Sequence, residues 1–273
     1  MRGAERSLLT RLREHELASR VASALGLAAL ALGATALGGV LFALLWAGAA
    51  VFFFAEFLTM IAYRPRATGA SIGAVGIAAS ALGVERGALL AGLAAICLAA
   101  LLVAARAETS ATRSFGAAGL LYAACVALPV IVLRSVPMHG FALTVWLYAV
   151  VWATDIGAFF IGRRLGGPKL WPRISPRKTW SGLIGGTLTG VGAAWLVNSW
   201  LVAVPLSGSA FLAVSVVASL AAHAGDLLES ALKRKYSVKD SSQLIPGHGG
   251  FMDRLDGFAL AALAAATGFW IAR

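Results

Sequence analysis

Charged residues are scarce in this chain of 273 residues, and acidic residues are the scarcest. Only 13% of the residues are charged and 12 are acidic, whereas 59% are apolar and the mean hydropathy is +0.83. A soluble domain has about 25% charged residues, so the composition excludes both an ordinary soluble protein and a disordered chain. The two cysteines lie in apolar runs, which excludes a disulfide-bonded secreted scaffold. The remaining fold class is an all-α, polytopic helical membrane protein.

The apolar runs predict about nine transmembrane helices, because a span needs about 20 apolar residues and backbone that faces lipid must be helical. The first two spans form one stretch, and the Gly-rich segment 33–39 is the expected bend. The predicted spans cover residues 20–38, 40–62, 68–84, 87–105, 115–134, 140–162, 181–203, 208–228 and 257–272. The chain then divides into a basic head (1–19), N-terminal spans (20–136) and a C-terminal transmembrane region (137–273) with cytoplasmic loops 163–180 and 229–256.

The net charge of +11, from 23 Lys and Arg against 12 acidic residues, follows the predicted topology. With the N-terminus in the cytoplasm and the C-terminus outside, 20 basic residues lie inside and only Arg86, Arg134 and Arg273 lie outside. This distribution obeys the positive-inside rule. We therefore expect no nucleic-acid partner. The basic head is predicted to lie on the anionic inner leaflet.

Half of the acidic residues gather in the C-terminal part, at predicted cytoplasmic helix ends and in loops: Asp155, Asp226, Glu229, Asp240, Asp253 and Asp256. Asp226 and Glu229 are spaced i,i+3, so they share a helix face. The same spacing separates Asp253 from Asp256. Two such pairs on adjacent helix ends form an oxygen-rich pocket, which favours magnesium over zinc. Four cations are interleaved with these acids: Lys233, Arg234, Lys239 and Arg254. The alternative interpretation is an ion-pair network that closes a helical hairpin.

The segment His248-Gly249-Gly250 directly precedes the ninth predicted span. Glycines at this position allow backbone N–H groups to approach an anion, and the N-terminus of a helix favours negative charge. Backbone donors, cations and metal-binding carboxylates together indicate a polyphosphate site. In such a site magnesium bridges phosphate oxygens, and Lys and Arg neutralise the charge of the leaving group.

Further polar residues lie in or near the predicted spans. Asp155 is expected within the sixth span, about two turns from its cytoplasmic end, and a buried acid in lipid is costly unless it has a function. A predicted turn at Ser175, followed by Lys178 and Thr179, is suited to an anionic headgroup. The alternative is that these cations snorkel to the interface. Glu56 lies late in the second span, and we expect it either to pair with a basic group or to belong to the site.

With these residues in view, the chain resembles the phosphatidate cytidylyltransferases, or CDP-diacylglycerol synthases, over about residues 150–260. Segments 155–159 and 174–179 are similar to this family, as is the Gly-Asp-Leu-x-Glu-Ser run that ends at Ser230. Ser181 is a departure, because many members carry Glu or Gln there. The family's C-terminal signature is matched by Ser230, Lys233-Arg234, Lys239-Asp240, Pro246, His248-Gly249-Gly250, Asp253-Arg254 and Asp256.

The resemblance implies that CTP and phosphatidate react to give CDP-diacylglycerol and pyrophosphate, at the cytoplasmic side of a bacterial-type inner membrane. It implies a homodimer that requires Mg²⁺, with a second, monovalent cation such as K⁺. Region 137–273 is then catalytic. Its predicted catalytic residues are Asp226, Asp253, Asp256 and Lys233, and the three aspartates are also the predicted metal ligands. The predicted substrate-binding and phosphate-binding residues are Asp155, Ser175, Lys178, Thr179, Arg234, Lys239, Asp240, His248, Gly249, Gly250 and Arg254.

Two other functions remain open on the residues alone. A CTP-dependent lipid kinase of the polyprenol or phytol type would transfer the γ-phosphoryl group of CTP instead of its cytidylyl group. A secondary transporter is the more distant alternative, because transporters have pseudo-symmetric halves with broken helices, whereas these acids gather in one half of the chain.

Overall fold

The computed structural model describes residues 21–200, 203–245 and 249–273, and this part of the chain is almost entirely helical. Within it, eight helices are long and apolar enough to cross a membrane. They are α2 (Gly39–Met60), α3 (Arg66–Glu85), α4 (Leu89–Arg106), α5 (Ser110–Arg134), α6 (Gly140–Leu165), α7 (Trp180–Trp200), α8 (Gly208–Lys235) and α9 (Met252–Ala272). The predicted all-α, integral membrane architecture is confirmed.

The first predicted span appears as a shorter apolar helix, Val21–Leu37. Its predicted first residue and the whole basic head lie outside the described residues. The expected bend in segment 33–39 is confirmed, because Gly38 and Gly39 both have positive φ angles, of 67° and 60°. Glycine adopts this conformation without the steric cost of a Cβ atom. The long apolar stretch is thereby divided into two helices.

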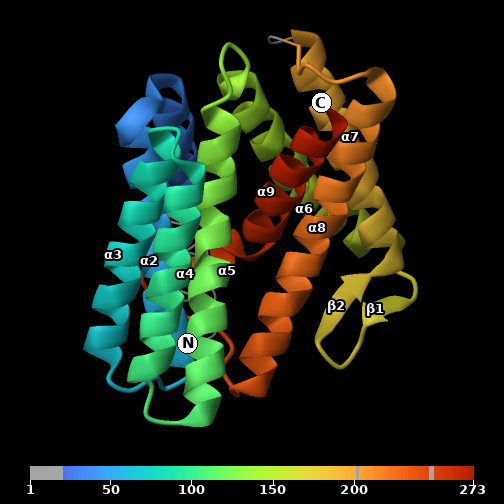
Figure 1. Cartoon of the computed structure of the whole chain (residues 1–273). Helices are drawn as coiled ribbons and strands as arrows, with labels where there is room; N and C mark the ends of the chain where they lie inside the picture. The colour runs from blue at the N-terminus through green and yellow to red at the C-terminus, as the bar shows by residue number, and fades with distance from the viewer. Residues whose placement is uncertain (1–20, 201–202, 246–248) are drawn as a thin grey trace, which may run out of the picture.

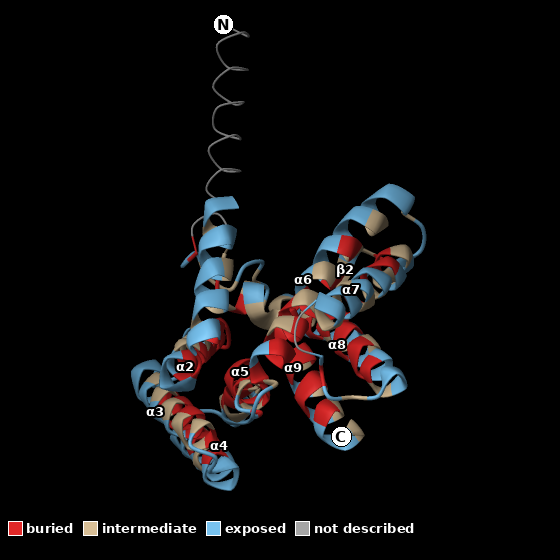
Figure 2. Cartoon of the chain, turned by 90° about the horizontal axis from the view of Figure 1, so that it is seen from above, coloured by how far each residue is buried: buried red, intermediate tan, exposed pale blue. Residues whose placement is uncertain are grey.

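The helices form two groups that meet along α9. In one group α2, α3, α4 and α5 pack together, and in the other α6 packs against α7 and α8 against α9. Contacts of α9 with α5 and α2 join the groups. The view from above shows mostly buried residues in α5 and α9 at this junction, and mostly exposed residues on the outward faces of α3, α4 and α7 (Figure 2). Helix α9, which carries Asp253 and Asp256, therefore lies in the core.

Three helices that carry polar residues are longer than their apolar runs predict. Helix α6 continues to Leu165 rather than 162, α8 continues to Lys235 rather than 228, and α9 begins at Met252 rather than 257. Hydropathy marks only the hydrocarbon region of about 30 Å, whereas helices continue through the polar interface. Asp155 is consequently about three turns, rather than two, from the end of α6.

A small β-hairpin, which the sequence did not predict, connects α6 and α7. Strands β1 (Lys169–Trp171) and β2 (Ser175–Thr179) pair antiparallel, with Lys169 opposite Thr179. The predicted turn at Ser175 is wrong, because the chain turns at residues 172–174 and Ser175 begins β2. In Figure 1 the hairpin lies at the same end of the bundle as the C-terminal end of α8 and the loop between α8 and α9.

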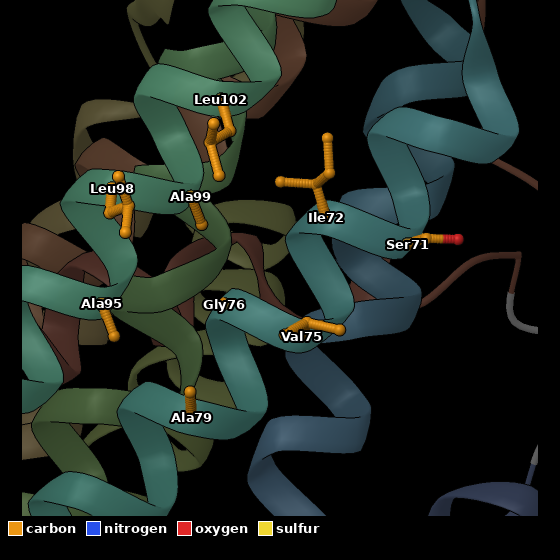
Figure 3. A pocket seen from close by; sticks show the side chains of 9 residues that line it. All are labelled: Ser71, Ile72, Val75, Gly76, Ala79, Ala95, Leu98, Ala99 and Leu102. Atoms are coloured by element: carbon orange, nitrogen blue, oxygen red, sulfur yellow. The ribbon is translucent and has the colours of Figure 1, made fainter.

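An apolar groove of about 410 Å³ lies between α3 and α4, far along the chain from the acidic residues. Figure 3 shows its side chains, which are aliphatic except for Ser71. The lining of this groove contains no charged side chain for phosphate or metal binding.

Candidate active site

Helices α8 and α9 are in backbone contact where they carry their carboxylates. A Cβ atom built on Gly225 would meet the carbonyl oxygen of Asp256, and one built on Gly257 would lie 3.0 Å from the carbonyl oxygen of Ala222. Small residues permit such close helix packing in membranes. Each glycine is the chain neighbour of an acidic residue, so this packing brings Asp226 of α8 close to Asp256 of α9.

Asp226, Glu229 and Asp256 form a cluster that we call the acidic cluster. One carboxylate oxygen from each lies within 4.8 Å of the others, and it is the one group of this kind among the described residues. The shared face predicted for Asp226 and Glu229 is confirmed. Glu229 is almost fully buried, whereas the side chain of Asp226 is 38% exposed. The cluster is thus open to the surroundings on the Asp226 side.

Two lysines balance the charge of these carboxylates. The Lys233 ammonium lies 2.7 Å from Glu229 Oε1 and 2.7 Å from Asp253 Oδ1. Lys178, which lies on β2, forms an ion pair with Asp226. The hairpin therefore delivers a cation to the cluster from outside the α8–α9 pair. Both lysines were predicted as site residues, and the structure places both against the acids.

Asp253 lies beside the acidic cluster and is linked to it through Lys233. Its Oδ2 atom accepts hydrogen bonds from the backbone N–H of Ser241 (3.0 Å), from the Ser241 hydroxyl (2.9 Å) and from the backbone N–H of Gly250 (2.8 Å). These bonds fix the loop between α8 and α9 against the first turn of α9. Asp253 thus has a clear structural part, and its part in metal binding stays a prediction.

Asp155 and Arg254 also belong to this end of the bundle. Asp155 interacts electrostatically with Asp226, Lys178 and Arg254. Asp155 lies at the surface of the protein, within α6, and its predicted place inside the lipid bilayer stays a prediction. This end of the bundle therefore carries five acidic residues, which are the three of the acidic cluster together with Asp155 and Asp253, and cations lie among them.

The N-terminus of α9 differs from the predicted phosphate cradle, because carboxylates already occupy its amide groups. The N–H of Gly250 donates to Asp253, while those of Phe251 (3.0 Å) and Met252 (2.8 Å) donate to Glu56. A Cβ atom on Gly249 would lie 2.8 Å from Asp253 Oδ2. In this conformation the glycines make room for carboxylates. A phosphate role for Gly249 and Gly250 stays a prediction, and His248 lies outside the described residues.

The other predicted residues fall into two sets. Arg234, Lys239 and Asp240 are exposed at the end of α8 and in the following loop, at the same end as the cluster. Thr179 is buried, and its hydroxyl accepts a hydrogen bond from the N–H of Gly182 (3.1 Å), so it caps α7. Ser181, where the family often has Glu or Gln, donates to the carbonyl oxygen of Gly166 and closes the base of the hairpin.

Sequence reasoning missed three contributions to this site. Glu229 was recognised as the partner of Asp226 but was not included among the predicted metal ligands. Tyr122, from α5, donates to the carbonyl oxygen of Asp256 (3.2 Å). Ser241 contacts both Asp253 and Glu56. The i,i+3 and i,i+4 spacings to Asp226 and Lys233 could have identified Glu229, whereas no local signal identifies Tyr122 or Ser241.

The fold and the site together define a class: a polytopic membrane protein that gathers carboxylates and lysines at one end of its helical bundle. The model of the cytidylyltransferase family matches residues 18–271 of the chain. The chain belongs to this family, and the nucleotidyltransferase class expected from the resemblance is confirmed.

Curated relatives agree with this assignment. A phosphatidate cytidylyltransferase of Brucella suis is 42% identical over 249 residues, which cover 90% of each chain. The enzyme of the same name from Haemophilus influenzae is 44% identical over 129 residues, or 46% of this chain and 44% of its own. That of Bacillus subtilis is 42% identical over 127 residues, or 46% of each chain. Neither the lipid kinase nor the transporter alternative gains support from these matches.

Proposed function

We propose that this protein is a phosphatidate cytidylyltransferase, which converts CTP and phosphatidate into CDP-diacylglycerol and pyrophosphate. The observation that carries the proposal is the acidic cluster with its two lysines, in a chain that is 42% identical to a phosphatidate cytidylyltransferase over 90% of its length. Such a site suits a reaction in which polyphosphate charge must be neutralised.

The acidic cluster fits a divalent cation. Its ligand atoms are carboxylate oxygens, which Mg²⁺ prefers, and opposite ligands of octahedral Mg²⁺ are about 4.2 Å apart. A separation within 4.8 Å is close to that value. Asp226 and Asp256 would hold the ion, with Glu229 as a third ligand and Asp253 as the ligand that the family resemblance adds. When bound, a divalent cation supplies charge neutralisation for the phosphate oxygens.

The chain's own residues bind and orient the two substrates. Lys178 and Lys233 lie against the carboxylates, within reach of a phosphate that enters the cluster. Arg234, Lys239 and Arg254 are exposed at the same end and are suited to the triphosphate and the lipid phosphate. Asp155 adds a negative charge close enough to interact electrostatically with Lys178 and Arg254.

In the proposed reaction an oxygen of the phosphatidate phosphate attacks the α-phosphorus of CTP. A new P–O bond forms, the bond between the α-phosphorus and the bridging oxygen breaks, and pyrophosphate leaves with that electron pair. The nucleophile is already an anion near neutral pH, so no strong general base is required. Catalysis rests on positioning and on charge neutralisation.

We also propose which side of the membrane the site faces. The end of the bundle that carries the hairpin and the α8–α9 loop faces the cytoplasm across a bacterial inner membrane, which agrees with the distribution of Lys and Arg. CTP then arrives from the cytosol, and phosphatidate arrives laterally within the bilayer. A second, monovalent cation such as K⁺ and a homodimer are part of this proposal on the family resemblance alone.

The test uses the purified protein with phosphatidate and CTP labelled either at the α- or at the γ-phosphate. Cytidylyl transfer places the α-label in the lipid product and the γ-label in pyrophosphate, whereas a lipid kinase places the γ-label in the lipid. Activity should require Mg²⁺ and should stop with a chelator. Asp256→Asn should abolish it, whereas Glu108→Gln, an exposed carboxylate on another loop, should not. A γ-labelled lipid, or full activity of Asp256→Asn, would contradict the proposal.

A further inference from the structure

Glu56 is a buried carboxylate in the N-terminal half of the chain, outside the acidic cluster. It lies in α2, is only 4% exposed, and is nearly 200 residues distant along the chain from the groups that it contacts. Burying a carboxylate without partners is very costly. Its partners therefore indicate what it does.

Among the described residues, Glu56 has four hydrogen-bond partners, and all of them belong to the connection between α8 and α9 or to the first residue of α9. Oε1 accepts hydrogen bonds from the Ser242 hydroxyl (2.6 Å) and the Phe251 N–H (3.0 Å). Oε2 accepts hydrogen bonds from the Ser241 hydroxyl (2.8 Å) and the Met252 N–H (2.8 Å). Each oxygen thus takes one hydroxyl and one backbone amide. Neither of the sequence alternatives, a basic partner or a direct place in the site, describes this arrangement.

These bonds tie α2 to the part of the chain that positions the acids of α9. The first amides of a helix have no partner within the helix, and a carboxylate there also interacts favourably with the helix dipole. Asp253 follows Met252 directly. The Ser241 hydroxyl lies between Glu56 Oε2 and Asp253 Oδ2, at 2.8 and 2.9 Å. Since it has one hydrogen, it donates to one of the two carboxylates at a time.

We propose that Glu56 is a positioning residue for the active site. From α2 it fixes Ser241, Ser242 and the start of α9, and thereby sets where Asp253 and Asp256 stand relative to α8. The kinetic test of this inference rests on the proposed function, whereas the test by hydrogen exchange does not. The N-terminal half carries none of the predicted site residues. Through Glu56 it nevertheless helps to determine the geometry of the site.

The hydrogen-bond pattern makes Glu56→Gln a sharp test. A glutamine has one acceptor oxygen, and its NH₂ group is a donor only. Whichever way the amide is turned, its NH₂ group faces a backbone N–H that cannot become an acceptor. A hydroxyl can rotate to compensate, but an amide N–H cannot. The variant should therefore lose the cap on α9 while keeping almost the same side-chain volume.

We expect Glu56→Gln to lower kcat/KM for CTP by about 10- to 100-fold, the usual effect of losing a residue that orients metal ligands. The Mg²⁺ concentration for half-maximal activity should rise with it. Ser242→Ala, which removes one of the four donors, should act in the same direction by about fivefold. Glu85→Gln is the matched control. Glu85 lies at the end of α3, away from the connection, and its substitution should leave both values unchanged.

A second readout is independent of activity. Hydrogen exchange at the amides of Phe251 and Met252 should be faster in Glu56→Gln than in the unaltered protein, with exchange in α4 unchanged. If the unaltered protein makes no CDP-diacylglycerol, the proposed function fails, and this exchange measurement still tests Glu56. If Glu56→Gln does not fold, Ser242→Ala carries the same test.

Two results would overturn the inference. The first is that Glu56→Gln leaves the KM for CTP and the Mg²⁺ dependence unchanged and lowers only the maximal rate, in proportion to the amount of folded protein. That pattern would mean a general loss of stability rather than a change in the geometry of the site. The second is that the amides of Phe251 and Met252 exchange at the same rate in Glu56→Gln as in the unaltered protein. Where Ser242→Ala replaces Glu56→Gln, an unchanged rate in that variant has the same meaning.

Discussion

Replacing Lys233 by methionine removes the ammonium group that stands between Glu229 and Asp253. The side chains of Lys233, Glu229 and Asp253 are only 15%, 2% and 7% exposed, so water screens their interaction little. Methionine keeps most of the length and the apolar stem of lysine. The perturbation is therefore mainly the loss of one positive charge between two nearly buried negative charges.

The magnitude follows from that burial. Removing one partner from a buried ion pair costs about 3–5 kcal/mol. Asp253 keeps two backbone N–H donors after the change, so we expect the lower end of this range, about 3 kcal/mol. At about 2–4 °C per kcal/mol for a chain of this size, the midpoint of thermal unfolding should fall by about 6–12 °C. A divalent cation should restore part of the loss, because it supplies positive charge beside Glu229.

The assay is thermal unfolding of the purified protein in detergent, with chelator and with Mg²⁺, for Lys233→Met and for Arg234→Met as the control. Arg234 lies on the same turn of α8 but is exposed, and such substitutions usually change stability by less than about 0.5 kcal/mol. Equal midpoints for the two variants would refute the reasoning. So would a Mg²⁺ effect that is no larger in Lys233→Met than in the unaltered protein.

Two further predictions concern the packing around the acidic cluster. Gly225→Ala should destabilise the protein by about 1–3 kcal/mol and lower its activity, because the added methyl group meets the backbone of Asp256 and Gly257. Gly192→Ala, where a Cβ atom meets nothing within 4 Å, is the control and should be no less stable in the same unfolding assay. Tyr122→Phe should cost about 1 kcal/mol, because it removes the hydrogen bond to the Asp256 carbonyl; an unchanged unfolding midpoint would show that this bond contributes nothing.

The sequence could predict the helices because a membrane requires long apolar runs, and it could predict their break because Gly38 and Gly39 permit positive φ angles. It could not predict where α8 ends and where α9 begins, since Lys233 and Asp253 are charged and lie beyond the apolar core. The β-hairpin escaped prediction because its strands are only three and five residues long and β2 contains Pro176, so the sequence shows no alternating pattern there.

The candidate site was predictable where its residues are neighbours in the chain. Spacing placed Asp226 and Glu229 on one face, and the structure agrees. Spacing could not show that Glu229, rather than Asp253, joins Asp226 and Asp256, because that depends on how two helices are rotated against each other. It also could not show the contacts of Glu56 with Ser241 and Ser242, since nothing local links residues so far apart in the chain.

The most direct test of the account is to locate a divalent ion in the protein itself. Crystals grown with CTP and Mn²⁺ in place of Mg²⁺ give an anomalous signal that marks the ion without any assumption about its ligands. We expect a peak coordinated by the carboxylates of Asp226 and Asp256, at the end of the bundle that carries the hairpin. An ion bound by neither of these residues would contradict it.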